Sequence, residues 1–245
     1  MDILAYFKKI YDQVPDWVQT MHNYVPNALE YYTKLRNEIM VDGALSKKDK
    51  ELILVGINAA RRYEKSMIFH TKGAIDSGAT MEELVETLTP CILSRGIPAW
   101  LEGVKAIDYA RKYMKRDENV STNESIETSN ERFDTVEEAV EYFKNEADGV
   151  ELDWVKKLKN EAEHALLHYG QLRKNILRDG HLSRKMKEFI LVGINVSERY
   201  EKGVEIHVNS AKKLGATNQE LAEVALVGLL TAGIPAWFEI TTFIK

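Results

Sequence analysis

The sequence predicts an all-α protein built by tandem duplication of one helical module. The segment LSKKDKELILVGINAARRYEK, which begins at Leu45, returns as LSRKMKEFILVGINVSERYEK at Leu182, 137 positions later. The pentapeptide GIPAW at Gly96 returns at Gly233 with the same shift. Residues 45–102 align with residues 182–239 without a gap, and about half of the positions are identical. Helix-capping signals recur through both copies, and no stretch shows the sustained period-two alternation of strands.

The repeat sets the expected domain organisation. The first module covers residues 1–116 and the second covers residues 135–245. Between them, residues 117–134 are rich in Ser, Thr, Asn and Glu and nearly free of apolar side chains, which predicts an exposed, mobile, acidic linker. Outside the ungapped block, Trp17 matches Trp154 and Leu35-Arg36 matches Leu172-Arg173.

The first helix boundaries follow from turn and capping residues. Asp42-Gly43 is expected to end a helix, with Gly43 in the left-handed conformation. Ser46 is expected to cap the next helix, with Asp49 completing a capping box; Met186 breaks the corresponding box in the second copy. Because neither Gly nor Pro occurs between positions 57 and 72, one long helix from Ser46 to Ser77 stays open as an alternative.

The later boundaries are marked in both copies. Gly78 and Gly215 are expected to end helices, and Thr80 with Glu83 and Thr217 with Glu220 form capping boxes for the helices that follow. The motifs Gly96-Ile-Pro98 and Gly233-Ile-Pro235 combine a helix stop with a proline at the next helix start.

Composition excludes several classes of protein. With 44% apolar residues, 29% charged residues and a net charge of −5, the chain is typical of a globular protein, not of a nucleic-acid binder. The longest uncharged run, residues 224–238, is too short to span a bilayer, and the N-terminus lacks the apolar core of a signal peptide. Cys91 is the only cysteine, which excludes an internal disulfide and favours a cytoplasmic location.

The candidate site residues lie in the buried repeat. Glu51, Val55, Asn58 and Arg62 are spaced to share one helix face, as are Glu188, Val192, Asn195 and Arg199. A histidine follows each glutamate by nineteen positions. The candidate catalytic residues are therefore the pairs Glu51 with His70 and Glu188 with His207. The candidate substrate-binding residues are Asn58, Arg62, Tyr63, Asn195, Arg199 and Tyr200.

Each of these features also has a structural interpretation. A duplicated Glu, Asn and Arg set can fix helix packing as a buried polar network without chemistry. Cys91 faces Gly228 in the other copy and is read as a small core residue. His164 and His168 have the spacing of a helical metal site, but a single helix supplies them and a surface helix is favoured. We therefore predict neither a metal site nor a cofactor.

The pattern resembles the carboxymuconolactone decarboxylase and alkylhydroperoxidase D superfamily. A buried helix opens with Glu51, His70 follows, and then Ala74, Gly78-Ala79-Thr80 and Glu83-Leu84; the second copy repeats this as Glu188, His207, Ala211, Gly215-Ala216-Thr217 and Glu220-Leu221. The resemblance covers about 60 residues in each copy. It implies an all-helical fold and a homo-oligomer of a size that the sequence leaves open, since members of the superfamily assemble as trimers or hexamers of small subunits and some are fused tandem repeats.

The resemblance also sets limits on activity. The peroxidase branch carries two cysteines ahead of its histidine, and Tyr63 and Ser66, or Tyr200 and Gly203, occupy those positions here. Because thiol peroxidase chemistry needs a thiolate, that activity is expected to be lost. The decarboxylase branch often places Glu-Trp ahead of its histidine, where Ser66-Met67 and Gly203-Val204 occur here.

Two function hypotheses follow. The first is a cofactor-free enzyme, a decarboxylase or a lactone- or enol-handling isomerase, in which a carboxylate-oriented histidine moves a proton and Arg62 or Arg199 holds an anionic small-molecule substrate. The second is a non-catalytic binding or structural protein whose cavity Tyr63 and Tyr200 fill. An open cavity that reaches His70 or His207 would favour the first; a sealed one would favour the second. Neither hypothesis involves nucleic acid or a membrane.

Overall fold

The computed structural model describes residues 2–114 and 132–244, and every regular element in these two ranges is a helix. The first set comprises α1 Ile3–Tyr11, α2 Asp16–Tyr24, α3 Pro26–Ile39, α4 Lys47–Ala60, α5 Glu64–Asp76, α6 Met81–Arg95 and α7 Ile97–Met114. The second set comprises α8 Val136–Glu146, α9 Asp153–Leu177, α10 Arg184–Glu198, α11 Glu201–Lys213, α12 Asn218–Ala232 and α13 Ile234–Phe238. The predicted all-α tandem duplication is confirmed.

The two sets correspond helix by helix. Helices α4, α5 and α6 repeat as α10, α11 and α12, while α2 and α3 repeat as the single helix α9. Helix α9 is kinked at Ala162, whose backbone angles are φ −158° and ψ 68°. Ala162 is the equivalent of Val25, the residue that separates α2 from α3. The kink therefore preserves the break between α2 and α3 within a continuous helix.

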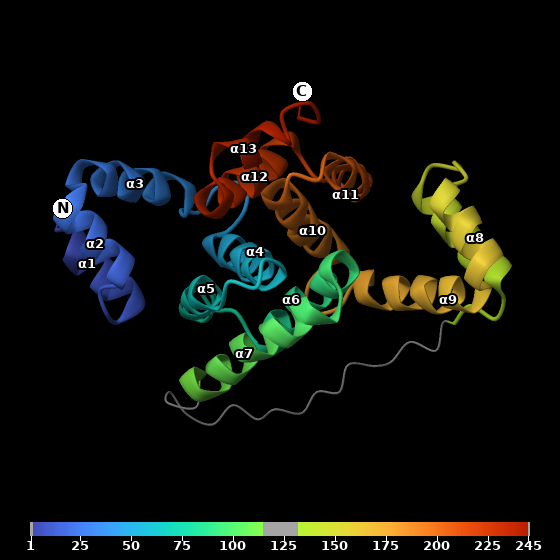
Figure 1. The fold of residues 1–245 in the computed structure, drawn as a ribbon, viewed down its shortest axis with the longest axis horizontal. Helices are drawn as coiled ribbons and strands as arrows, with labels where there is room; N and C mark the ends of the chain where they lie inside the picture. Colours follow the sequence, from blue (N-terminus) through green and yellow to red (C-terminus); the bar gives the residue numbers. More distant parts are fainter. Residues whose placement is uncertain (1, 115–131, 245) are drawn as a thin grey trace.

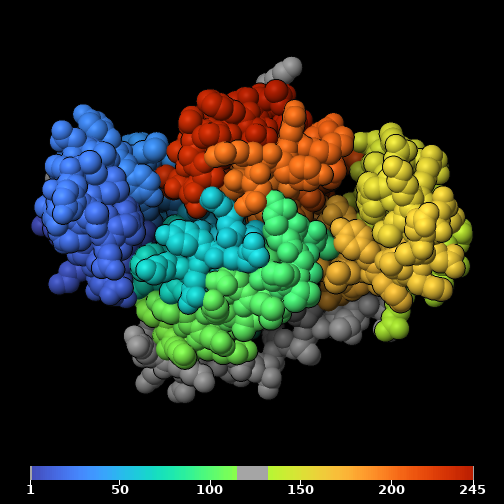
Figure 2. Space-filling model, viewed as in Figure 1, coloured from blue at the N-terminus to red at the C-terminus, as the bar shows by residue number. Residues whose placement is uncertain are grey.

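Two helical arms flank a central body (Figure 1). Helices α4–α7 and α10–α13 form the centre, with α1–α3 on one side and α8–α9 on the other. In Figure 2 the α1–α3 arm is blue and the α8–α9 arm is yellow. Each arm has a small core of its own, built around Phe7 and Phe143 respectively. Each arm also reaches the opposite module, since α3 contacts α12 and α9 contacts α6.

One hydrophobic core joins the modules through α4 and α10. A side chain at Gly56 would place its Cβ 2.7 Å from a methyl carbon of Ile190, and one at Gly193 would lie 2.9 Å from a methyl carbon of Ile53. Gly193 and Ile190 are the repeat equivalents of Gly56 and Ile53. The two contacts are therefore one contact made twice, as a pseudo-twofold arrangement requires.

A second reciprocal contact surrounds this core. Glu223 on α12 accepts hydrogen bonds from the backbone N–H groups of Ala44 and Leu45 at 2.8 and 3.0 Å, and its carboxylate lies 2.9 Å from Lys50 Nζ. Glu86 on α6 does the same in the opposite direction, with the N–H groups of His181 and Leu182 and with Lys187 Nζ at 2.9 Å. We call these two sets the glutamate clamps.

The first clamp corrects the expectation for Gly43. Helix α3 ends at Ile39, and Gly43 is not among the glycines with positive φ. A Cβ at Gly43 would lie 2.5 Å from an oxygen of Glu223. A side chain at position 43 would displace this carboxylate from the clamp, so the glycine is explained by the approach of Glu223 and not by a left-handed turn.

The remaining helix-end predictions divide in two. Gly78 and Gly215 adopt φ of 90° and 82°, and the Thr80–Glu83 and Thr217–Glu220 capping boxes are formed, as predicted. Ser46 caps α4 by accepting from the Asp49 N–H at 3.1 Å. The expected box is not completed, because the Asp49 carboxylate accepts from the Ser46 hydroxyl instead of its backbone N–H.

The single long helix over residues 46–77 is ruled out. Helix α4 ends at Ala60, Arg62 takes the left-handed conformation with φ 56°, and the Tyr63 N–H donates to Asn58 O at 2.9 Å. The second copy repeats the turn with Arg199 at φ 56°. This six-to-one hydrogen bond defines a helix stop that usually carries glycine. The shared helix face through Arg62 and Arg199 is therefore also wrong.

Two further expectations bear on the chain as a whole. The predicted linker, residues 117–134, lies outside the described residues apart from 132–134. Among the helices of the described ranges, none is both long and apolar enough to cross a membrane.

Candidate functional site

The reversal after α4 brings each histidine back to its glutamate. In a continuous helix, residues nineteen apart would lie about 28 Å from each other. Because α5 folds back along α4, His70 Nδ1 lies 2.7 Å from Glu51 Oε2. His207 Nδ1 and Glu188 Oε2 are separated by the same 2.7 Å in the second module.

Both pairs are buried, with one edge of the histidine at the surface of a cavity. Glu51 and Glu188 are 2% and 0% exposed, whereas each histidine is 9% exposed. Gly73 makes room for the first carboxylate, since a Cβ there would lie 2.7 Å from Glu51 Cδ. With Nδ1 facing the carboxylate, Nε2 is the ring nitrogen left for a ligand. Neither Nε2 has a hydrogen-bond partner within residues 2–114 and 132–244.

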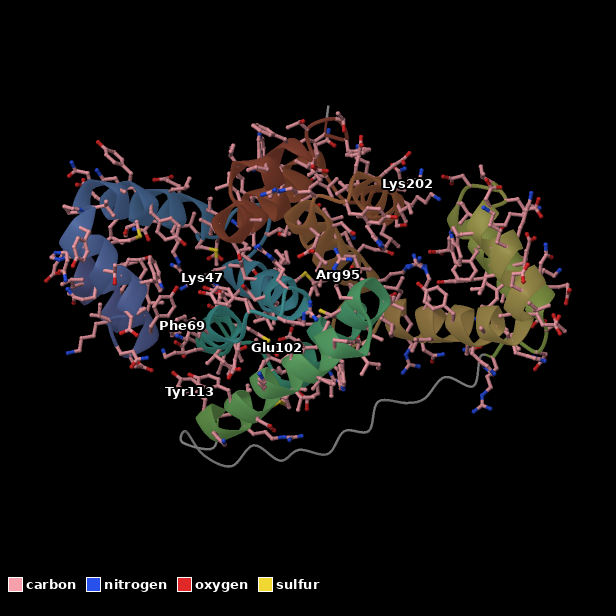
Figure 3. All side chains as sticks on the ribbon, viewed as in Figure 1. Lys47, Phe69, Arg95, Glu102, Tyr113 and Lys202 are labelled. Atoms are coloured by element: carbon pink, nitrogen blue, oxygen red, sulfur yellow. The ribbon has the colours of Figure 1, made fainter. Side chains whose placement is uncertain are left out.

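The first cavity has a volume of about 880 Å³ and lies between the α1–α3 arm, α5 and α12. His70, Arg36 and Tyr63 line it, together with the rings of Tyr11, Trp17, Tyr32 and Phe69. Leu230 and Thr231 of the second module complete its wall. Figure 3 shows Phe69 on the side of α5 that faces this arm.

The second cavity has a volume of about 460 Å³ and lies at the equivalent place. Its lining includes His207, Arg173, Asn195, Tyr200, Trp154 and Tyr169. Leu93, Ser94 and Arg95 of the first module complete its wall, and Figure 3 shows Arg95 at the end of α6 next to α10. Each module therefore builds part of the other module's cavity.

Arg36 and Arg173 are the buried arginines of the two cavities. Arg36 Nη1 donates to the Tyr6 hydroxyl at 3.0 Å, its guanidinium lies 5.8 Å from the centre of the Tyr11 ring, and Nη2 is 3.8 Å from Glu51. Burial alone would lower the pKa of Arg36, but Tyr11 and Glu51 raise it above its usual value. Arg36 is therefore a permanent cation at the cavity wall.

The predicted substrate-binding residues are only partly in the cavities. Tyr63 and Tyr200 line them and are 52% and 53% exposed, so their rings do not seal the openings. Asn58 and Asn195 are buried, and each donates its amide to the carbonyl of the residue four positions earlier at 2.7 Å. Of the two, Asn195 lines its cavity.

Arg62 and Arg199 are the predicted residues that the structure places elsewhere. Both are exposed at the end of α4 or α10, and neither lines a cavity. The arginines that line the cavities are instead Arg36 and Arg173. The signal was present, because Leu35-Arg36 and Leu172-Arg173 match in the repeat alignment. This match lies outside the ungapped block, and nothing in the sequence links these arginines to the histidines.

Within the described ranges, no group of three or more His, Cys, Asp or Glu side chains is arranged to hold a metal ion. Cys91 is buried at the α4–α6 contact, 3.4 Å from the Gly56 carbonyl, and lines neither cavity.

The fold and the paired sites define a tandem all-α protein with a buried Glu–His pair beside a cavity in each half. The chain belongs to the carboxymuconolactone decarboxylase family, whose model matches residues 26–109 and 164–244. The two matched segments contain both Glu–His pairs and both buried arginines.

Known proteins support this assignment at the level of fold. A crystal structure from Burkholderia xenovorans LB400, described as a candidate gamma-carboxymuconolactone decarboxylase subunit, covers 96% of this chain and 92% of its own at a TM-score of 0.63 and 19% identity. Two uncharacterized proteins of Methanocaldococcus jannaschii, MJ1511 and MJ0742, are 26% and 29% identical over 90 and 84 residues. These alignments span 37% and 34% of this chain and 84% and 81% of the relatives.

Proposed function

We propose that the chain is a cofactor-independent enzyme of the decarboxylase or lactone- and enol-isomerase type, in which His70 and His207 move a proton to or from carbon. The observation that carries the proposal is the open cavity beside each histidine, with a buried carboxylate fixed on the opposite ring nitrogen. A histidine buried only for packing has no need of such a cavity.

The geometry supports the following chemistry. The glutamate accepts a hydrogen bond from Nδ1–H and so presents Nε2 to the cavity. As a base, Nε2 takes a proton from a carbon next to a carbonyl, and the electron pair of the broken C–H bond moves onto the carbonyl oxygen as an enolate. In an isomerisation, the protonated ring then returns the proton to a different carbon. In a decarboxylation no C–H bond is broken: the electron pair of the C–CO₂ bond moves onto the carbonyl oxygen as CO₂ leaves, and the imidazolium, protonated beforehand by water, donates its Nε2 proton to the carbon.

The non-catalytic alternative receives less support. It rested on the rings of Tyr63 and Tyr200 filling the positions that cysteines occupy in the peroxidase branch. Both rings are about half exposed, and the cavities beside them are open.

The test incubates the protein with a carboxylated γ-lactone in D₂O and follows the exchange of its C–H protons for deuterium by ¹H NMR. The double variant His70→Gln, His207→Gln keeps the shape of the side chains but removes their titration. We expect it to lose exchange or turnover by about 10²–10⁴-fold while it keeps the wild-type melting temperature. His164→Gln is the matched control, because the His164 side chain is 84% exposed and lines neither cavity.

Two outcomes would overturn the proposal. In one, the double variant exchanges protons at the wild-type rate. In the other, neither protein has activity and the variant loses about 1–3 kcal/mol of stability for each unsatisfied buried partner, which would identify the pairs as structural.

A further inference from the structure

The two cavities are built from equivalent residues. Tyr32 and Tyr169, Arg36 and Arg173, and His70 and His207 occupy matching positions in their linings. Differences in what the cavities bind must come from the lining positions where the copies have diverged, such as Phe69 in the first cavity and Ile206 in the second.

The main divergence lies beside the buried arginine. In the first module Arg36 faces neutral groups of α1, the Tyr6 hydroxyl at 3.0 Å and the Tyr11 ring at 5.8 Å. Burial raises the pKa of Tyr11 to about 12, so this ring carries no charge at neutral pH. In the second module, the end of α8 supplies Glu146, which lines the cavity itself. Its carboxylate accepts a hydrogen bond from Arg184 and lies 3.7 Å from Arg173.

The other lining Arg and Lys side chains also differ between the cavities in whether they have a carboxylate partner. In the second cavity, Arg95 pairs with Glu198 at 3.4 Å and Lys202 with Glu205 at 2.6 Å, so each of its lining Arg and Lys side chains has a carboxylate partner. In the first cavity, Lys65 makes no ion pair within the described ranges.

The lining carboxylates of the first cavity leave Arg36 available. Its nearest carboxylate is Glu51 at 3.8 Å, which is already bound to His70. Glu51 itself is not part of the lining. Of the two carboxylates that are, Glu64 binds Lys105 at 2.6 Å, and Asp16 begins α2, where the helix N-terminus favours it.

From these contacts we propose that the two sites have diverged, and that the first cavity alone binds an organic anion with a flat, apolar body, such as an aromatic carboxylate. Arg36 supplies the planar, charged donor that recognises a carboxylate, and the Tyr11, Trp17 and Phe69 rings line the space for the apolar part. In the second cavity the Glu146 carboxylate is part of the lining, 3.7 Å from Arg173, and it would repel an incoming anion there, whereas Glu51 is not part of the first cavity's lining. This inference rests on the proposed function, since it says which histidine receives an anionic substrate.

The first experiment measures binding of benzoate to the full chain by isothermal titration calorimetry, with benzamide as the uncharged control. We expect one benzoate per chain and at least tenfold weaker binding of benzamide. Arg36→Gln should weaken benzoate binding by at least tenfold, whereas the matched variant Arg173→Gln should leave it unchanged.

Because Arg36 is buried, its substitution could unfold the arm, so a second measurement does not touch it. Trp17 lines the first cavity and Trp154 the second, which makes their fluorescence specific to each site. Benzoate should still change the emission of Trp154→Phe, and that change should be lost in Trp17→Phe. Glu146→Gln should free Arg173 and raise the stoichiometry to two.

The inference is overturned by two equal sites in the wild-type chain, by loss of binding in Arg173→Gln but not in Arg36→Gln, or by no saturable binding up to about 10 mM. These outcomes are independent of turnover. One benzoate per chain without proton exchange would leave the inference standing while the proposed function fails, and two equal sites in an active enzyme would do the reverse.

Discussion

Burial decides the chemistry of Cys91. Its side chain is 0% exposed, and desolvation raises the pKa of the thiol to about 12. At neutral pH the thiolate, which is the nucleophile in peroxide reduction, is therefore almost absent. We expect no thiol-dependent turnover of an organic hydroperoxide, measured by coupled consumption of a dithiol reductant. Turnover that Cys91→Ser abolished would contradict both this expectation and the burial on which it depends.

The residues at positions 62 and 199 act through their backbone. Arginine rarely adopts positive φ, yet in both copies it does so where α4 or α10 stops and the chain reverses. The reversal is what joins Glu51 to His70 and Glu188 to His207. The arginines retained at 62 and 199 therefore lie at the helix ends, whereas the buried Arg36 and Arg173 line the two cavities.

At the scale of elements, the packing of α4 against α10 depends on two glycines. A valine at Gly56 would drive its side chain into Ile190, whose methyl carbon would lie 2.7 Å from the new Cβ. We expect Gly56→Val to lower the free energy of unfolding by about 1–3 kcal/mol, as overpacked cores do. Urea denaturation followed by circular dichroism measures the change.

A compensating substitution tests the cause. Ile190→Ala removes the methyl carbon that the valine would meet, so the double variant should recover part of the loss. If the double variant is instead destabilised by the full sum of the two single effects, the contact between Gly56 and Ile190 is not the origin of the cost.

At the scale of the whole molecule, the glutamate clamps tie the modules together and make their association sensitive to acid. Burial would raise the pKa values of Glu86 and Glu223, but backbone N–H groups and the paired lysines outweigh it and hold both pKa values below the ordinary 4.5. A carboxyl with a lowered pKa stabilises the fold above its unfolded pKa, and this contribution is lost as pH falls through the folded pKa.

We therefore expect the free energy of unfolding to fall below pH 4.5 and the double variant Glu86→Gln, Glu223→Gln to lose part of this dependence. Near neutral pH the variant should be less stable by about 1–3 kcal/mol for each clamp, and the gap should narrow in acid. Denaturant titrations from about pH 3 to pH 7 measure this. Glu30→Gln is the control, since its pair with Lys34 is exposed; equal effects from the control would show that the clamps are not special.

The sequence by itself determined the fold class, the duplication and the members of each Glu–His pair. Helix caps such as Thr80 with Glu83 are local signals, and the duplication repeats this one as Thr217 with Glu220. The shared spacing of nineteen residues identified Glu51 with His70 and Glu188 with His207, although the same sequence also allowed a straight helix that would have held them far apart.

Only the tertiary structure shows that each Glu–His pair lies beside a cavity. Leu230 and Thr231 close a cavity more than 150 positions away from His70, and Glu223 explains Gly43 across a similar distance in sequence. Such contacts leave no period or motif in the chain, because they depend on how two finished modules pack. For the same reason, only the packed arms show that α1 places the Tyr11 ring beside Arg36, whereas α8 places the cavity-lining Glu146 beside Arg173.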